Sequence, residues 1–377
     1  MLDGNVSMEP AGVDTFFAAE LNGVLTGGDR VYTDPSGDAE LQAGQIAVRL
    51  GGGTDLTVSA MSDSLAQFGV AAGSVHLRVA AIDPGTVVEV DSPGAAVTVL
   101  QPGDLRMDVD ATAHTTTVTL LSGQVQVDSP GGSQTLTAGQ TVRVHGADTE
   151  SGQAAYSEPV TPADADALDT FSATRDNAQA TGLDAAGPYV NQDTTGVADL
   201  ADNGSWDTSD FGPVWYPAVS VVWRPYCSGR WRYVSPWGWT WVGAEPWAFA
   251  PFHYGRWTEI GGRWGWIPGP RILRPFYAPA LVVFAGGPQF ASSLGYPQGF
   301  GIVAWFPLGP REPYLPGYRG SPLYVNRLNA SNLYNPDPHE VLGSYNQREV
   351  NVYAAGLGAR PVYSNRQATI AVPQTSF

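Results

Sequence analysis

A chain of 377 residues is long enough for two domains or three small ones. Its hydrophobic content of 43% allows packed cores, whereas only 15% charged residues, with 45 glycines and 30 prolines, favours short strands and turns over long helices. The formal charge is −17, and all of the basic residues are arginine. Because such a charge repels phosphate backbones, we exclude nucleic acid as a partner and expect neutral polymers or other proteins.

The first 150 residues predict continuous β structure. Apolar and polar residues alternate in about ten short runs, of which Ser74–Val79 and Thr141–Val144 are typical. Glycine-rich breaks such as Gly51–Gly53 separate the runs at distances that suit hairpins. We therefore expect residues 1–150 to form an all-β domain, either a sandwich, a barrel or a solenoid.

Six segments of this region occur in an order known from one bacterial family. They are GDRVYTDPSGDAELQ, AVRLGGGTDLTV, GSVHLRV, VEVDSPGAAVTVLQPGDLRMDVD, GQVQV and AGQTVRV. In this order they resemble the FecR-type extracytoplasmic β domain. The best-known members of that family are transmembrane regulators whose outer domain senses a partner protein. The resemblance implies an extracytoplasmic location, which can be periplasmic, at the cell surface or secreted.

No stretch of the sequence predicts a membrane span. A transmembrane helix needs about 18 or more consecutive apolar residues, and no such run occurs. A signal-peptide core is not visible either, and the abrupt opening MLDGNVSMEPAG is compatible with an export segment upstream of this sequence. We expect no transmembrane segment in the chain.

Two further regions have weak patterns. Residues 151–203 are rich in Ala, Asp, Thr and Gly, which predicts a linker with one short helix near 162–180. Residues 271–377 are rich in Pro, Tyr and Asn and predict an irregular, extended C-terminal region. Within this region we expect two apolar strands, at Pro275–Phe284 and Gly301–Phe306.

A tryptophan-rich repeat lies between these two regions, at 204–270. Residues Val222–Gly269 hold nine of the twelve tryptophans, and Trp223–Trp231 aligns with Phe249–Trp257 at a shift of 26 residues. A partial copy, from Gly204 to Trp215, precedes both. Such repetition is typical of one small supersecondary unit copied in tandem, so we predict a module of β-hairpins.

Four stretches of this half of the chain resemble a bacterial family of unassigned function. They are WRPYCSGRWRYVSPWGWTWV, PFHYGRWTEIGGRWGWIPG, YAPALVVF and AWFPLGPREPYLPGY. They are similar to DUF6600 proteins, in which a FecR-type domain precedes a region rich in Trp, Tyr and Pro. The resemblance implies export to the cell envelope and supplies no activity.

The repeat also predicts a ligand-binding surface. In a strand, residues two apart share a face, so Trp237, Trp239 and Trp241 would form one row of rings, as would Trp264 and Trp266. Exposed indoles form flat apolar platforms with N–H donors, which suit the C–H faces of sugar rings. The predicted ligand-binding residues are Trp237, Trp239, Trp241, Trp264, Trp266, Tyr226, His253 and Tyr254.

The alternative interpretation is structural. The repeat has little Leu, Ile or Val to bury, so its tryptophans can themselves be its core, each removing about 150–250 Å² from water. We favour this interpretation for most of the rings. Arginines among the rings, such as Arg256 and Arg263, are expected to stack on them. Contact with a partner protein is the third possibility, since Trp, Tyr and Arg are typical interface anchors.

No motif predicts catalysis, a metal site or a cofactor. The histidines have no metal-ligand spacing, and the acidic cluster at 199–210 lacks the pattern of a calcium loop. Glu245 and Glu259 are the least improbable pair for a glycosidase. The lone Cys227 is expected to be buried beside Tyr226.

These observations predict an exported, non-enzymatic envelope protein that binds polysaccharide or a partner protein through the aromatic module. The alternative is a structural protein whose module and C-terminal region drive self-association into oligomers or filaments.

Overall fold

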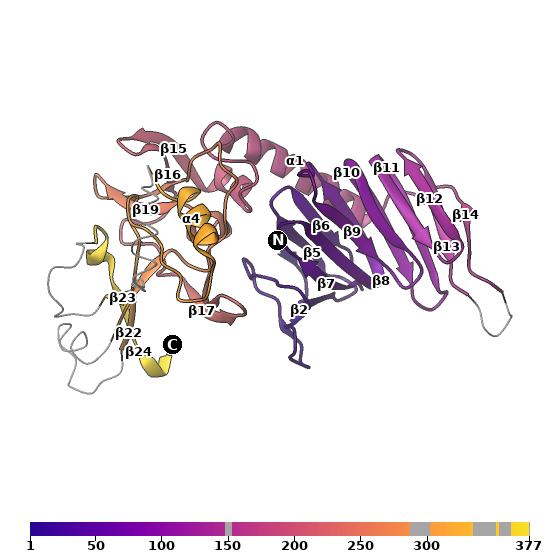
Figure 1. Ribbon diagram of the computed structural model, residues 1–377, viewed down its shortest axis with the longest axis horizontal. Helices are drawn as coiled ribbons and strands as arrows, with labels where there is room; N and C mark the ends of the chain where they lie inside the picture. Colours follow the sequence, from indigo (N-terminus) through magenta and orange to yellow (C-terminus); the bar gives the residue numbers. More distant parts are fainter. Residues whose placement is uncertain (148–152, 287–301, 335–351, 354–362, 377) are drawn as a thin grey trace. The chain divides into compact units, whose positions relative to one another are not determined.

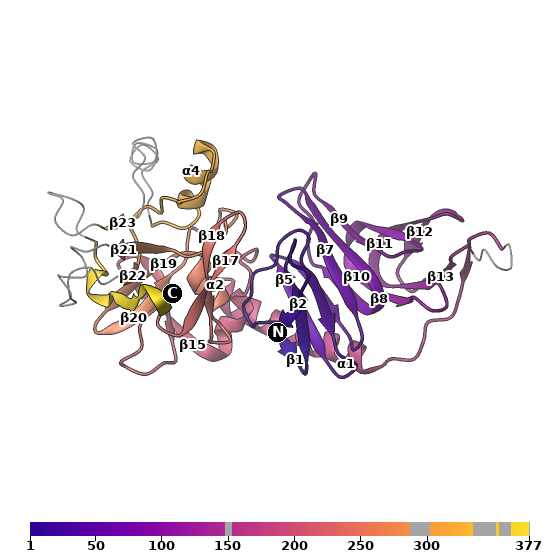
Figure 2. The same cartoon turned by 90° about the horizontal axis from the view of Figure 1, so that it is seen from below.

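The computed structural model describes residues 1–147, 153–286, 302–334, 352–353 and 363–376 (Figures 1 and 2). The prediction of an all-β protein is confirmed, because most of the described elements are strands arranged in several sheets. The chain divides into two compact units, Met1–Ala178 and Gln179–Phe377, which we call the N-terminal and C-terminal units. No helix among the described residues has the length and apolarity needed to span a membrane.

The described part of the N-terminal unit contains one sheet of fourteen strands. The strands are β1 (Leu2–Asp3), β2 (Val6–Glu9), β3 (Phe17–Ala18), β4 (Arg30–Thr33), β5 (Asp38–Ala43), β6 (Ile46–Leu50), β7 (Asp55–Met61), β8 (Leu65–Val79), β9 (Val87–Asp91), β10 (Ala96–Asp110), β11 (Thr115–Ser129), β12 (Gly132–Thr137), β13 (Thr141–His145) and β14 (Tyr156–Pro159). The long strands β8, β10 and β11 each pair with different neighbours along their two halves.

Glycines stand where the long strands change partners. Gly73 and Gly123 have positive φ angles of 92° and 86°, which L side chains rarely adopt. A Cβ on Gly103 would lie 2.0 Å from the carbonyl oxygen of Ser122. These positions let the sheet bend so that alternating residues from both halves of the strands meet in one aliphatic core, dominated by Val and Leu.

Helix α1 (Ala167–Ala186) follows β14 and contains the boundary between the two units. It is longer than the helix expected near 162–180. Its first half packs against the N-terminal unit through Leu168 and a set of ion pairs. Residues 162–178 are therefore part of a folded unit and not of a free linker.

The C-terminal unit consists of hairpins and a small sheet. Its described elements are η1 (Val197–Asn203), β15 (Gly204–Ser209), β16 (Gly212–Pro217), β17 (Gly229–Val234), β18 (Gly238–Gly243), α2 (Phe249–His253), β19 (Arg256–Ile260), β20 (Arg263–Ile267), β21 (Val282–Gly286), β22 (Ile302–Pro307), α4 (Pro322–Ala330), β23 (Val352–Tyr353), η2 (Arg366–Ala368), β24 (Ile370–Pro373) and η3 (Gln374–Ser376).

The C-terminal region is more regular than the sequence predicts. The two apolar strands are present as β21 and β22, and they form a sheet with β23 and β24 within the described residues. Trp305 and Val282 from this sheet are buried in the same core as the hairpin tryptophans. The predicted boundary at residue 270 therefore does not separate two packed bodies, because residues 204–270 and the following strands share one core.

Candidate functional site: the aromatic hairpins

The repeat consists of three hairpins, β15–β16, β17–β18 and β19–β20, within residues 204–267, all of which the structure describes. Each hairpin places one tryptophan directly opposite another, and directly opposed residues share a face of the pair. The three cross-strand pairs are Trp206 with Trp215, Trp231 with Trp241, and Trp257 with Trp266. The predicted duplication into hairpins is therefore present, and a tryptophan pair is its invariant feature.

The glycine that opens each copy is needed by this pair. A Cβ on Gly204, Gly229 or Gly255 would lie 2.3–2.4 Å from a carbonyl oxygen of the facing strand. The same Cβ would lie within 2.7 Å of the indole of the second tryptophan of the pair. Since only glycine leaves room for that ring against the backbone, the recurrent Gly-x-Trp pattern is a packing motif.

The paired rings form most of the core. Trp215, Trp257 and Trp266 are almost completely buried. Their indole nitrogens donate to the carbonyl oxygens of Leu200 at 3.2 Å, Pro251 at 2.9 Å and Tyr254 at 2.8 Å, respectively. A buried indole N–H with a backbone partner carries no desolvation penalty, so the structural interpretation of these rings is the correct one.

Five of the eight residues predicted to bind a ligand are buried: Tyr226, Trp241, His253, Tyr254 and Trp266. They cannot contribute to an exposed platform as the protein is folded. The reason is the low aliphatic content of the repeat, which leaves aromatic side chains as the available core material.

Tyr226 and His253 have structural partners that account for their burial. The Tyr226 hydroxyl donates to Phe252 O at 2.8 Å and accepts from Leu281 N at 3.0 Å, and burial raises its pKa. His253 Nδ1 lies 2.8 Å from Ala278 O, and burial lowers the pKa of this imidazole to about 4. His253 is therefore neutral at physiological pH and holds the chain near Ala278 in place.

The predicted row of three rings on β18 is not formed. Trp237 lies in the turn before the strand, half-buried, with its ring centroid 5.0 Å from that of Tyr277. Trp239 and Trp241 do share a face, but Trp241 is at the buried end of the hairpin and Trp239 is 42% exposed. Of the eight predicted residues, Trp239 is the most accessible.

Trp239 has an aromatic partner that the sequence analysis did not single out. Tyr233 on β17 is directly opposite Trp239, and the two rings meet edge to face at 5.7 Å. Tyr233 is 69% exposed. We call Tyr233 and Trp239 the outer pair, because they continue the face of the Trp231–Trp241 pair towards the turn. The position of Tyr233 two residues after Trp231 could have predicted that the two rings share a face of the strand.

The next hairpin has a corresponding position with different chemistry. There Glu259 is opposite Trp264, again two residues beyond the buried pair. Glu259 is exposed and Trp264 is half-buried. Beside them the Arg263 guanidinium lies 4.3 Å from the centroid of the Tyr216 ring, as expected for arginines among the rings. Arg256 differs, because it is buried and donates to the carbonyl oxygens of Gly255, Glu312 and Asn332.

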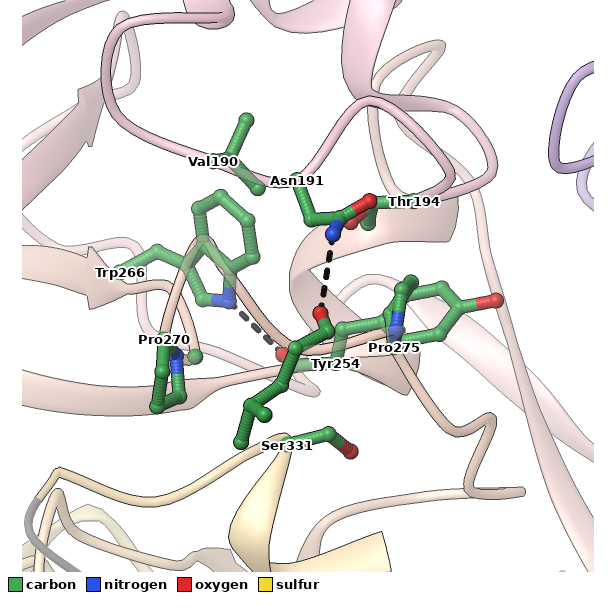
Figure 3. A pocket seen from close by; sticks show the side chains of 10 residues that line it. Val190, Asn191, Thr194, Tyr254, Trp266, Pro270, Pro275 and Ser331 are labelled. Carbon is green, nitrogen blue, oxygen red and sulfur yellow. Dashed lines mark hydrogen bonds between the residues drawn. The ribbon is translucent and has the colours of Figure 1, made fainter.

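A shallow pocket brings Tyr254 and Trp266 next to the 190–194 segment (Figure 3). Asn191 Nδ2 donates to Leu273 O at 3.0 Å at its rim. The cavity has a volume of about 10 Å³, which suits one water molecule and no larger ligand.

Glu245, Glu259 and Cys227 lie in different surroundings. Glu245 accepts from the Trp223 indole at 2.7 Å, and Glu259 is exposed on a hairpin. Within the described residues, no three His, Cys, Asp or Glu side chains are grouped so that they could hold a metal ion. Cys227 is exposed, contrary to expectation, because Tyr226 turns inward with a positive φ and leaves its neighbour outside.

Comparison with solved structures gives only a distant likeness. Two crystal structures of a candidate anti-sigma factor from Parabacteroides distasonis ATCC 8503 match at 16% and 15% identity, each with a TM-score of 0.30. Each match covers 35% of this chain and 60% of the other, so this chain spans under two thirds of that protein.

The family comparison falls on the hairpins. No curated protein matches the chain. Residues 197–312, which include all three hairpins and β21, match the family of unknown function DUF6600.

Proposed function

We propose that this protein is a non-enzymatic, extracytoplasmic binding protein that holds a neutral polysaccharide of the cell envelope through the outer pair, Tyr233 and Trp239. The location rests on the resemblance of the first 150 residues to FecR-type domains. The single observation that carries the binding role is the aromatic face of β17–β18, which continues past its buried tryptophans to two exposed rings.

The outer pair has the properties of a sugar contact. Two rings with different orientations present both a flat face and an edge, and the Tyr233 hydroxyl and Trp239 indole add polar groups. The net charge of −17 disfavours polyanions, which leaves neutral glycans as the better ligands. The remaining indoles support this pair by fixing the hairpin in the core.

The test is binding of the full chain to neutral polysaccharides and cell-wall fractions, by affinity electrophoresis and calorimetry. Trp239→Ala is expected to weaken binding about tenfold, which corresponds to about 1.4 kcal/mol. Tyr32→Ala, which removes a similarly exposed tyrosine from the N-terminal unit, serves as the control. Binding that is equal in wild type and both variants, or that is absent with all polysaccharides, would refute the proposal.

Self-association is the second candidate function, and a separate observation favours it. Val221, Val222 and Ile272 in the C-terminal unit are 95%, 83% and 88% exposed, which is a large cost in water for aliphatic side chains. Size-exclusion chromatography with light scattering tests this. A concentration-dependent mass that Val221→Ser with Val222→Ser abolishes would support self-association, and a monomer at all concentrations would exclude it.

A further inference from the structure

A row of ionisable side chains crosses the sheet of the N-terminal unit. Glu40 on β5 is directly opposite Arg49 on β6, Arg49 is opposite His76 on β8, and His76 is opposite Arg106 on β10. Cross-strand partners share a face, so these four residues, the polar row, point the same way. Glu40, Arg49 and His76 are nevertheless buried. Residues at the start of α1 cover them.

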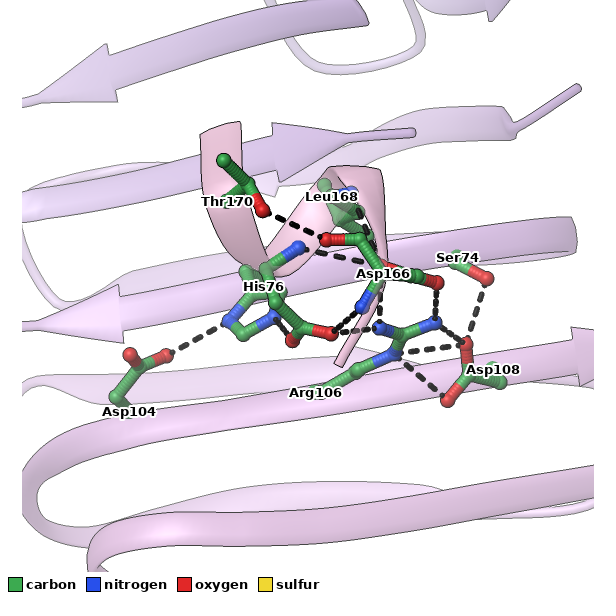
Figure 4. A network of polar contacts seen from close by, with 9 residues as sticks. Ser74, His76, Asp104, Arg106, Asp108, Asp166, Leu168 and Thr170 are labelled. Carbon is green, nitrogen blue, oxygen red and sulfur yellow. Dashed lines mark hydrogen bonds and ion pairs between the residues drawn. The ribbon is translucent and has the colours of Figure 1, made fainter. Parts of the chain in front are cut away.

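Two acidic residues bind one end of the polar row, Asp166 directly before α1 and Asp169 in its first turn (Figure 4). Arg106 donates to Asp166 at 2.7 Å and to Asp169 at 2.7 Å. His76 Nε2 lies 2.8 Å from Asp169, and its Nδ1 lies 3.3 Å from Asp104 of the sheet itself. Asp169 therefore joins Arg106 and His76, and the helix start is tied to two strands.

The next turns of α1 bind the other end. Arg175 donates to Glu40 at 2.8 Å, and Arg49 lies 2.7 Å from Asp176 and 2.8 Å from Glu40. Arg78 on β8 adds a second bond to Asp176 at 2.8 Å. The four residues of the polar row therefore each have one partner in the sheet and at least one in the helix segment.

Two large apolar side chains of this half of the helix are withdrawn from water: Leu168 is buried and Phe171 is half-buried. Leu168 is the buried aliphatic side chain of this half of the helix, and it packs over Gly51, where a Cβ would lie 3.3 Å from Leu168 Cδ2. Ser172, one turn further, is also buried. Apolar burial is not weakened by NaCl or by acid. Ion pairs weaken when salt screens their more exposed members, such as Asp166, and when acid protonates their carboxylates.

We infer that the first half of α1 is an electrostatic latch on the N-terminal unit, which high ionic strength or strong acid releases while both units stay folded. Docking protects the chain at the boundary between the units, because Arg175 and Asp176 are held against the sheet.

The pH response follows from the groups that face one another. Arg106 lowers the pKa of Asp166, and Arg175 and Arg49 offset the desolvation of Glu40 and lower its pKa. Carboxyl groups with lowered pKa values stabilise docking above their ordinary pKa and lose this effect as the pH falls.

His76 acts in the opposite direction. It faces Asp104 and Asp169, with Arg49 and Arg106 as its cross-strand neighbours, and despite burial the two carboxylates raise its pKa. Its contribution is complete below its ordinary pKa of 6.5 and is lost as the pH rises through the raised value. Docking is therefore strongest between the ordinary pKa of the carboxyl groups and that of His76, and it weakens most below about pH 4.

Trypsin reports on the latch directly. The chain has no lysine, and Arg175 is its single basic residue between Arg143 and Arg224. Cleavage after Arg175 divides the chain close to the unit boundary, and the docked side chain resists it. In the full-length chain, the rate at Arg175 is expected to rise about tenfold or more between about 0.05 and 1 M NaCl, after correction with an unstructured arginine peptide.

Matched variants separate the latch from general stability. Asp166→Asn with Asp169→Asn is expected to raise the cleavage rate at low salt about tenfold and to remove most of its salt dependence. Asp184→Asn makes the same chemical change at an exposed position of α1, and it is expected to leave the rate unchanged. Unchanged thermal unfolding of the sheets in the double variant would show that the unit itself remains folded.

Hydrogen exchange measures how docking of the helix depends on pH. Protection of the amides of residues 168–178, corrected for intrinsic rates, is expected to be greatest near pH 5–6 and to fall below about pH 4. A cleavage rate and a protection that change neither with salt, nor with pH, nor in the double variant would overturn the inference and make this half of α1 a fixed part of the unit.

Discussion

The two units bury apolar surface in β structure with different side chains. The N-terminal unit has a core of Val and Leu from alternating strand positions, and it contains no tryptophan. The C-terminal unit contains all twelve tryptophans and fills its main core with them, together with Tyr and Phe. Short hairpins offer few inward positions, so each position must bury more area, and an aromatic ring supplies it.

The difference teaches how a repeated aromatic should be interpreted. An indole brings a polar N–H into the core, where a backbone acceptor such as Tyr254 O stabilises it, and its ring needs a glycine such as Gly255 where it meets the facing strand. A tryptophan that has both a backbone acceptor for its N–H and a facing glycine is a core residue. Trp239 lies outside the buried pair with its ring partly in water, and this position is what makes it a candidate for binding.

The largest expected effect is loss of a core indole. Trp266→Ala is expected to destabilise the C-terminal unit by about 3–5 kcal/mol, because it leaves a cavity and removes the donor to Tyr254 O. Urea unfolding followed by tryptophan fluorescence reports this unit alone, since the other has no tryptophan. A loss below about 1 kcal/mol would contradict an aromatic core.

The corresponding change in the aliphatic unit is Leu77→Ala. We expect a loss of about 2–4 kcal/mol from the buried side chain, seen by far-UV circular dichroism with an unaltered fluorescence transition. Leu121→Ala, at an exposed position of the same sheet, is the control. If both probes shifted together in Leu77→Ala, the two units would unfold as one cooperative body and the comparison would fail.

Acid is expected to act on the C-terminal unit through His253. Burial lowers the pKa of His253 to about 4, below the ordinary value of 6.5, so the folded unit binds the proton less readily than the unfolded chain. Its contribution to stability is thus complete above about pH 6.5 and is lost as the pH falls towards 4, by roughly 3 kcal/mol in total. The slope of urea stability against pH should flatten in His253→Gln, and an identical slope would exclude this role.

The smallest effect is expected at the outer pair. Trp239→Ala should change the free energy of unfolding by less than about 1 kcal/mol, because its ring is partly in water and the buried pair remains. The same urea titration measures it beside Trp266→Ala. A large loss would mean that Trp239 belongs to the core and would remove the physical basis of the binding proposal.

Much of this could be predicted from local pattern. The alternation in residues 1–150 predicts the strands, and the shift of 26 residues predicts the hairpins. The apolar runs at 275–284 and 301–306 predict two strands that overlap β21 and β22. The predicted platform of Trp237, Trp239, Trp241, Trp264 and Trp266 is not exposed as a whole, because Trp241 and Trp266 are buried. Trp241 and Trp266 hold equivalent positions in their hairpins, since each is the second tryptophan of a buried cross-strand pair.

The sequence by itself determined the all-β class, the repeat and its recurrent Gly-x-Trp spacing, because these depend on periodicity and on residue size. Only the tertiary structure decided which rings are in water and which charges α1 covers. A strand pattern states which residues share a face, but burial of that face depends on what the rest of the chain brings to it. His76 and Trp241 occupy ordinary alternating positions of their strands. Their surroundings come from residues far away in the sequence, Asp169 for His76 and Trp305 for Trp241.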